Sequence, residues 1–235
     1  MFKMTHVSKV YQTEYVATHA LRDLEIHVRR GEFVAVTGPS GAGKTTFLKI
    51  AGMLETPSSG LYQLDGIEVG SLSDNERSRI RNQKIGFIFQ TFNLLPDISI
   101  QANVELPFCY RGVGARERRL RATVALDRVG LTSRANHYPS QLSGGQQQRA
   151  AIARALAGSP SILLADEPTG NLDVETGEGI AALIEELHRE GTTVVMVTHD
   201  AALASRAGRR LHILDGHLVD ITDHSEEAAM QGEPA

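Results

Sequence analysis

One stretch of nine residues constrains the fold of this chain more than any other. Residues 38–46 read Gly-Pro-Ser-Gly-Ala-Gly-Lys-Thr-Thr and match the phosphate-binding pattern G-x-x-x-x-G-K-[ST]. The glycines let the backbone curl so that successive N–H groups face one hollow, and the helix that follows attracts anions through its dipole. In this pattern Lys44 brings a positive charge to the β- and γ-phosphates, and Thr45 brings a hydroxyl to Mg²⁺. The stretch therefore predicts a nucleotide-binding site.

Composition limits the fold and the partners. With 235 residues, 41% of them hydrophobic, the chain can form one large domain or one domain with a subdomain. Its 24 basic and 28 acidic residues give a net charge of −4, which argues against a nucleic-acid partner bound by bulk charge. The single cysteine, Cys109, allows neither an internal disulfide nor a cysteine zinc site. It is expected to be a small apolar side chain in a reducing compartment.

The membrane signals that a sequence can carry are missing from this one. The N-terminus has no apolar core of a signal peptide, and no run approaches the ~20 apolar residues that span a bilayer. The chain is therefore expected to be soluble, and any membrane role is expected to come through a partner.

Apolar patterns predict strands on both sides of the phosphate-binding stretch. Residues 2–36 read as strands, with Leu24, Ile26 and Val28 alternating with polar residues. Residues 47–54 can continue the helix that starts after the glycines. Tyr11, next to a polar loop, could be a core residue or a platform on which a flat ring stacks, and its spacing alone favours the core.

Two Asp-Gly pairs predict hairpins. Residues 61–69 are expected to turn at Asp65-Gly66, and residues 211–219 at Asp215-Gly216. The polar segment 72–84 is at most a surface helix.

Four predicted strands end on residues that suit one shared site. These strand ends are Gly38, Gln90, Asp166 and His199. Acids at the C-terminal ends of parallel strands lie where α/β sheets bind ligands. Asp166 suits a Mg²⁺ shell and the next residue, Glu167, suits a water-activating base, although an acid pair can also simply cap a helix. A lone histidine at a strand end is usually structural, but four such ends together favour a common site.

Residues 91–157 change to helical patterns. Ser143 and Gln146, in Leu-Ser-Gly-Gly-Gln at 142–146, form a capping box, which by itself only begins a helix. Gly144 and Gly145 are poor helix formers and suit a close approach between backbone and ligand, so a second anion site is equally open. Seven arginines and two acids between residues 111 and 134 predict a solvated helical face or a surface attracted to an anionic membrane leaflet.

Together these motifs resemble the nucleotide-binding subunit of ATP-binding-cassette (ABC) transporters. The phosphate loop, Gln90, Leu-Ser-Gly-Gly-Gln, the acidic pair 166–167, Asn-Leu-Asp at 171–173 and His199 occur in the family's order over residues 1–219. Segments 86–90, 93–96, 103–107 and 165–173 look like the MacB/LolD/FtsE group, whose members serve macrolide or peptide efflux, lipoprotein release or division-linked signalling. Asn171 departs from the alanine that many cassettes have, and Gln101-Ala102 from the pair common before Asn103.

The resemblance implies a fold and a domain division. The fold class is α/β: a phosphate-loop NTPase (RecA-like) core with an antiparallel β subdomain and an α-helical signature subdomain. Residues 1–219 are expected to form the nucleotide-binding domain, with its helical subdomain at about 91–157, and residues 220–235 a mobile acidic tail.

The resemblance also implies roles for named residues. Tyr11 would stack on adenine, which reverses the preference for the core. Glu167 would polarise the attacking water and His199 would hold the γ-phosphate, with Lys44 and Gln90 as further catalytic residues. Thr45, Gln90 and Asp166 would serve Mg²⁺. The residues expected to contact ATP are Tyr11, Gly38, Pro39, Ser40, Gly41, Ala42, Gly43, Lys44, Thr45, Thr46, and, across a dimer, Ser143, Gly144, Gly145, Gln146 and Asp173.

The expected activity is ATP hydrolysis that powers a separate permease. Two copies would sandwich two ATP molecules head to tail, at the cytoplasmic face of the cell membrane and bound to a permease that is expected to be of the four-helix type. Export or lipoprotein release is the favoured type, with division-linked signalling as the alternative. A soluble repair or ribosomal ATPase is disfavoured, because only 97 positions separate Thr45 from Leu142 and the chain holds one cassette.

Overall fold

The computed structural model describes residues 1–13 and 15–221, and most of the expected acidic tail, from residue 222 on, lies outside the described residues. The chain divides into two compact units, which are described separately. The first comprises residues 1–72 and the chain from Val195 on, and the second comprises residues 73–194.

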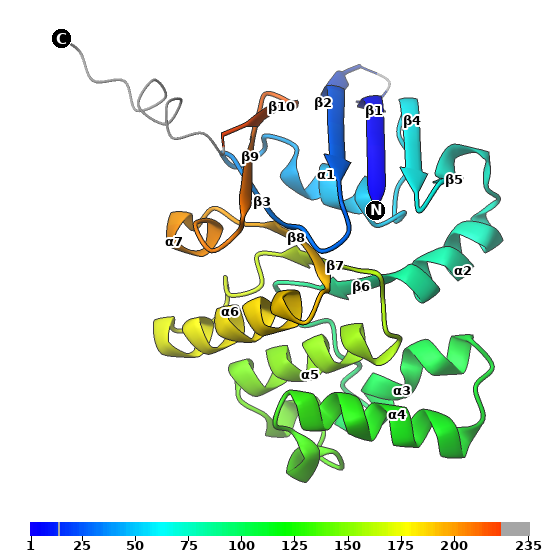
Figure 1. The fold of residues 1–235 in the computed structure, drawn as a ribbon, viewed down its shortest axis with the longest axis vertical. Coiled ribbons are helices and arrows are strands. Elements are labelled where there is room, and N and C mark those ends of the chain that lie inside the picture. Colours follow the sequence, from blue (N-terminus) through cyan, green and yellow to red (C-terminus); the bar gives the residue numbers. More distant parts are fainter. Residues whose placement is uncertain (14, 222–235) are drawn as a thin grey trace. The chain divides into compact units, whose positions relative to one another are not determined.

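An antiparallel sheet forms one part of the first unit (Figure 1). Its strand order is β2-β1-β4-β5, with β1 at Phe2–Gln12, β2 at Ala17–Val28, β4 at Ser59–Leu64 and β5 at Ile67–Glu68. The predicted alternation in β2 is confirmed, since Leu24, Ile26 and Val28 are buried. The predicted turn at Asp65-Gly66 is also confirmed, with φ of 50° and 79° at these residues.

A mostly parallel set of strands forms the other part of the first unit. Strand β3, Phe33–Thr37, pairs in parallel with β9, Arg209–Leu214, and β9 pairs antiparallel with β10, His217–Asp220. Strand β8, Thr193–Val197, neighbours β3, and its last three residues belong to this unit. All five residues of β8 and all but the last of β3 are buried, as expected of strands covered on both faces.

Helix α1, Lys44–Ala51, follows β3 directly and is shorter than the sequence predicts. It ends at Gly52, and Met53 takes a left-handed conformation with φ of 54°. Glycine is a poor helix former, and the left-handed residue that follows it turns the chain out of the helix, so the continuation to residue 54 is wrong. A one-turn helix, α7 at Ala201–Ala204, completes the unit with the short 3₁₀ turn Val69–Ser71.

The second unit combines two parallel strands with five helices. Strand β6, Ile85–Ile88, pairs in parallel with β7, Ile162–Asp166, with Ile88 opposite Ala165. The helices are α2 at Asp74–Lys84, α3 at Ile100–Tyr110, α4 at Ala115–Arg128, α5 at Gly144–Ala157 and α6 at Val174–Arg189. Helices α3, α4 and α5 pack against one another (Figure 1), while α2 buries no residue, as its polar sequence predicts.

The arginine-rich segment is only partly a solvated face. Arg111 reaches inward and donates to the side chain of Asn82 and to the carbonyl oxygen of Gly158. Arg118 pairs with Glu105, whereas Arg116 and Arg119 are exposed. Among the described residues no helix is long and apolar enough to cross a membrane.

Candidate nucleotide-binding site

The phosphate loop between β3 and α1 requires glycine for steric reasons. Gly38 and Gly43 have φ of 144° and 108°, in the region that side chains avoid. A Cβ atom at Gly38 would lie 2.2 Å from the carbonyl oxygen of Ile213, and one at Gly43 would lie 2.2 Å from the carbonyl oxygen of Ala20. The loop is therefore pressed against β9 and β2, and its curled backbone cannot accept side chains at these two positions.

The N-terminus of α1 is prepared for an anion. Its N-cap residue, Gly43, makes no side-chain capping bond, and the first turn contains no acidic residue. The amides of a first helical turn carry no intrahelical partner, so they attract negative charge. The ammonium of Lys44 lies over the loop and donates to the carbonyl oxygens of Gly38, at 2.7 Å, and Pro39, at 2.9 Å. The loop thus has a cation beside a helix N-terminus.

Residues that the sequence did not assign to the nucleotide site support this loop. The N–H of Gly216, in the second Asp-Gly turn, donates to the carbonyl oxygen of Ala42 at 3.2 Å. The carbonyl oxygen of Gly216 in turn accepts from the N–H of Arg22 at 2.8 Å. Under the loop, His212 lies 3.0 Å from the hydroxyl of Thr37. Burial, and then the charge of Lys44, lower the pKa of His212 below its usual range. This side of the loop therefore favours a neutral imidazole.

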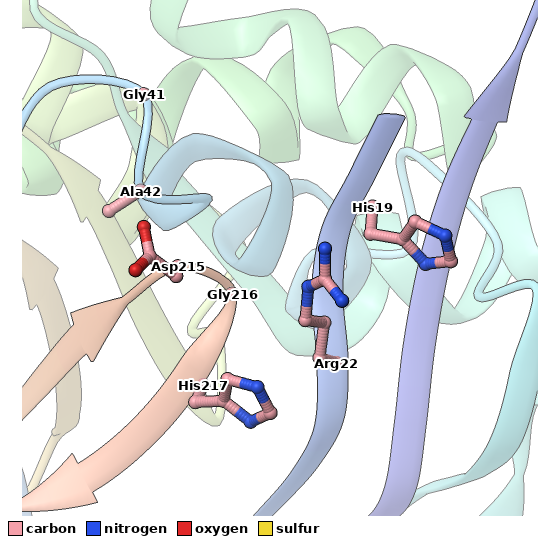
Figure 2. Close-up of a pocket in the computed structure, with 7 residues that line it drawn as sticks. All are labelled: His19, Arg22, Gly41, Ala42, Asp215, Gly216 and His217. Atoms are coloured by element: carbon pink, nitrogen blue, oxygen red, sulfur yellow. The ribbon is translucent and has the colours of Figure 1, made fainter. Parts of the chain in front are cut away.

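A hollow of about 530 Å³ lies beside the Asp215-Gly216 turn (Figure 2). Its walls are the loop residues Gly41 and Ala42, two side chains of β2 and the turn between β9 and β10. Figure 2 shows His19 and Arg22 projecting from β2, Asp215 from the turn, and His217 from the start of β10. The hollow is polar and open, and it shows how closely the turn approaches the phosphate loop.

Tyr11 is exposed rather than buried. Its side chain at the end of β1 is 39% exposed, so the interpretation from spacing alone, that it belongs to the core, is wrong. Its hydroxyl donates to Glu55 at 2.6 Å.

His199 follows β8 in the first unit and is exposed. The N–H of the preceding residue, Thr198, donates to the carbonyl oxygen of Val36 at 3.1 Å, two residues before Gly38. The following residue, Asp200, caps α7. The backbone around His199 is thereby held next to the strand that enters the phosphate loop.

In the second unit, Asp166 ends β7, and Gln90 lies two residues after the end of the paired strand β6, so the predicted strand end at Gln90 is wrong by two residues. Asn171 exchanges two hydrogen bonds with Gln90: the Nε2 of Gln90 donates to Asn171 Oδ1 at 3.3 Å, and Asn171 Nδ2 donates to the backbone carbonyl of Gln90 at 2.9 Å. The asparagine that departs from the family pattern thus fixes the glutamine. Buried Gln148 also connects the segments that follow β6 and β7, because its amide donates to the carbonyl oxygens of Phe89 and Pro168.

Glu167 has a strained backbone. Its φ of 45° places a residue other than glycine in the left-handed region, which costs about 1–3 kcal/mol and is found mainly at functional sites. The N–H of Gly170 donates to its carbonyl oxygen at 3.0 Å. The chain therefore turns sharply after Asp166.

The Leu-Ser-Gly-Gly-Gln segment begins α5 with the predicted capping box. The N–H of Gln146 donates to the hydroxyl of Ser143, and the N–H of Ser143 donates to the side chain of Gln146. Asp173 caps α6 in the same way by accepting from the N–H of Thr176 at 2.9 Å, and hydrogen bonds from Thr176 lower the pKa of Asp173.

The two glycines of this segment serve different purposes. A Cβ at Gly145 would lie 2.2 Å from Thr176 Cγ2, so packing of α5 against α6 explains that glycine within the chain. A Cβ at Gly144 would meet only ordinary contacts, at 3.4 Å from Leu172. Packing within the chain therefore leaves Gly144 unexplained.

Comparisons with known proteins identify the family. The model of the ABC transporter family matches residues 21–170. The chain is 48% identical over 219 residues to the uncharacterized ABC transporter ATP-binding protein YvrO of Bacillus subtilis, covering 93% of this chain and 96% of that protein. It is 47% identical to the lipoprotein-releasing system ATP-binding protein LolD of Colwellia psychrerythraea, covering 94% and 86%. It is also 47% identical to the macrolide export ATP-binding/permease protein MacB of Rhodopseudomonas palustris, of which it spans 34%.

A solved structure agrees with these relatives. The ABC cassette MJ0796, described as a dimer in a post-hydrolysis state bound to ADP and Pi, is 44% identical to this chain. It superposes with a TM-score of 0.86 over 94% of this chain and 99% of its own. This likeness confirms the predicted fold class, and the relatives confirm the resemblance to the MacB/LolD-like group. The chain belongs to the ABC transporter family, as an ATP-binding subunit that hydrolyses ATP.

Proposed function

We propose that two copies of this chain close head to tail over two ATP molecules and thereby power a separate membrane permease. The dimeric state of the similar cassette MJ0796 supports the first part. The second part is supported by relatives of similar length named as ATP-binding proteins. In this proposal residues 1–219 act as one nucleotide-binding domain, attached at the inner face of the cell membrane through a permease of the four-helix type.

The proposed cargo class is that of export or lipoprotein release. A LolD and a MacB relative are equally identical to this chain, at 47%, so identity favours neither. The proposal is therefore limited to the shared principle, in which closure and reopening of the ATP-bound dimer move a permease.

The observation that carries the proposal is the phosphate loop, which excludes a Cβ at Gly38 and Gly43 and faces an uncapped helix N-terminus. Such a cradle fits the phosphates of ATP and positions Lys44 beside them. The oxygen donors expected for Mg²⁺, on Thr45, Gln90 and Asp166, are the hard ligands that this ion prefers. When bound, Mg²⁺ would neutralise part of the phosphate charge.

The remaining site residues have separate proposed roles in ATP binding and hydrolysis. We assign Glu167 to orient and polarise the attacking water through its carboxylate, and His199 to donate a hydrogen bond to the γ-phosphate. The hydrogen bonds with Asn171 hold the amide of Gln90 in place. Ser143 and Gly144 at the start of α5 are assigned to ATP bound by the second copy, which gives the otherwise unexplained Gly144 a purpose.

The substitution Glu167→Gln tests this division. It keeps the size of the side chain but removes the carboxylate, and general bases contribute about 10²–10⁴-fold to rates. ATP hydrolysis should fall by that order while ATP still binds, as measured by calorimetry, because Lys44 and Thr45 are intact. Glu186→Gln, on the exposed side of α6, is the matched control and should hydrolyse ATP at the wild-type rate. Wild-type turnover by Glu167→Gln would exclude this residue as the base.

A further inference from the structure

A compact polar cluster holds the ring of Tyr11 in a defined orientation. Its hydroxyl donates to Glu55 Oε2 at 2.6 Å, and the other carboxylate oxygen of Glu55 lies 2.9 Å from the ammonium of Lys9. The ammonium also donates to the backbone carbonyl of Thr56 at 2.9 Å and lies over the Tyr11 ring, 5.0 Å from its centroid. Each of the three side chains thus contacts the other two.

This cluster is better ordered than a surface ion pair. The side chains of Lys9 and Glu55 are only 13% and 22% exposed, and the carboxylate receives both a phenol and an ammonium. Burial alone would raise the pKa of Glu55, but the hydrogen bonds from Tyr11 and Lys9 outweigh it, so the pKa lies below its ordinary value. Glu55 is therefore charged at neutral pH, as its hydrogen bonds require.

The cluster also connects Tyr11 to the phosphate-binding helix. Glu55 follows α1 by four residues, and its N–H donates to the carbonyl oxygen of Lys49 in that helix. Position 11 on β1 and position 55 after α1 are 44 residues apart in the sequence, and this contact joins the tyrosine to the segment that follows the phosphate-binding helix. Binding of a ligand that contacts both Tyr11 and the phosphate loop would therefore depend on this contact.

We propose that Lys9 and Glu55 are positioning residues that fix the Tyr11 ring for stacking with the base of ATP, an inference that rests on the proposed function. Lys9 occupies one face of the ring, so the base stacks on the other. A cation beside one face and a hydrogen bond to the hydroxyl restrict rotation of the ring, and a restrained platform loses less freedom when the base binds. Neither residue touches the phosphates.

The test distinguishes binding of the base from binding of the phosphates. In the full chain, Glu55→Ala should raise the KM for ATP about fivefold, as expected for the loss of one typical intramolecular hydrogen bond, with kcat within twofold. The concentration of inorganic tripolyphosphate that halves ATP hydrolysis, measured with ATP at its KM, should not change, because tripolyphosphate has no base. Tyr11→Phe should raise KM similarly, and the double variant should add little. Glu55→Gln, which keeps an acceptor for the hydroxyl, should lie between Glu55→Ala and wild type.

Controls make the outcomes distinct. Asp65→Asn breaks a comparable ion pair, with Arg30, in the same unit and should leave both measurements unchanged. Equal shifts for ATP and tripolyphosphate in Glu55→Ala would show that the cluster only supports the fold, and no shift in either would show that it does not position the ring. Both results would overturn the inference. If Lys44→Ala hydrolysed ATP like wild type, the proposed function itself would fail instead.

Discussion

Gly144 and Gly145 are adjacent in the sequence, and the structure explains only one of them from within the chain. The Cβ of an alanine at position 145 would overlap Thr176 Cγ2, whereas the same change at position 144 meets only ordinary contacts. Motif membership alone would assign both glycines to ligand binding. Packing within the chain requires glycine only at position 145, so alanine substitutions at the two positions should have different effects.

We expect Gly145→Ala to destabilise the protein, because forcing a methyl group into a packed interface typically costs about 1–3 kcal/mol. Without that overlap, alanine would favour the helix over glycine by about 0.5–1 kcal/mol. Thermal denaturation should show a lower Tm for Gly145→Ala and recovery when Thr176→Ser removes the overlapping methyl. Gly144→Ala should keep the wild-type Tm or raise it, but lose ATP hydrolysis through the partner copy. Equal Tm values for the two alanine variants would contradict this distinction.

His212 should give the protein a measurable pH dependence. Its pKa in the folded protein lies below the value of about 6.5 in the unfolded chain, so the unfolded state binds more protons in this window. The stability that it contributes is present above about pH 6.5 and is lost as pH falls through the folded pKa. Tm should therefore drop more between pH 7.5 and 5.5 in the wild type than in His212→Gln, which retains a partner for Thr37. Parallel curves would contradict this assignment.

At the scale of elements, side chains from helices α5 and α3 hydrogen-bond to the backbone of the loop after β6 and hold it in place. Phe92 and Asn93 both take left-handed conformations, with φ of 56° and 51°, and Arg154 of α5 donates to both of their carbonyl oxygens. Asn103 of α3 binds the N–H and the carbonyl oxygen of Leu95, whose side chain is 49% exposed. An exposed apolar side chain on a rigid loop suits a docking contact.

We expect segment 90–96 to contact the permease, with Leu95 as its exposed apolar residue. Leu95→Asp should abolish transport in the complex while ATP hydrolysis by the isolated chain persists, because a charge in an apolar contact is costly. Leu120→Asp is the control, since Leu120 is 66% exposed on α4, away from this loop in the sequence. Transport assays in reconstituted vesicles would check this, and normal transport by Leu95→Asp would place the docking contact elsewhere.

At the scale of the whole molecule, the described residues form half of each proposed ATP site. The N-cap residues of α5 and α6, Ser143 and Asp173, are exposed, and their proposed ligand is bound by a second copy. Association should therefore depend on ATP rather than on a permanent interface.

Light scattering should show a monomer without nucleotide. Addition of ATP to Glu167→Gln should give a dimer that wild type forms only briefly, because the variant cannot hydrolyse the ATP that joins the copies. An obligate dimer that ignores ATP would argue against the sandwich. An inactive Glu167→Gln that binds ATP but never dimerises would argue against the role given to Ser143 and Gly144.

The sequence by itself determined those features that depend on local patterns. The glycine spacing at 38–43, the capping box of Ser143 and Gln146 and the apolar strands predict elements that the structure contains, because each depends on residues close together in the chain. The ordered motifs from Lys44 to His199 identified the family for the same reason. Local preference failed where the last turn of α1 stops at Gly52.

Only the tertiary structure decided which distant residues support the site. Glu55 holds Tyr11, Gly216 holds Ala42, Asn171 holds Gln90 and Gln148 holds Pro168, and these pairs are 44, 174, 81 and 20 residues apart. No local pattern encodes such contacts, because they arise when strands and helices pack and a buried polar group must find a partner wherever the fold places one. The assignment of Gly145 to packing came from the tertiary structure alone.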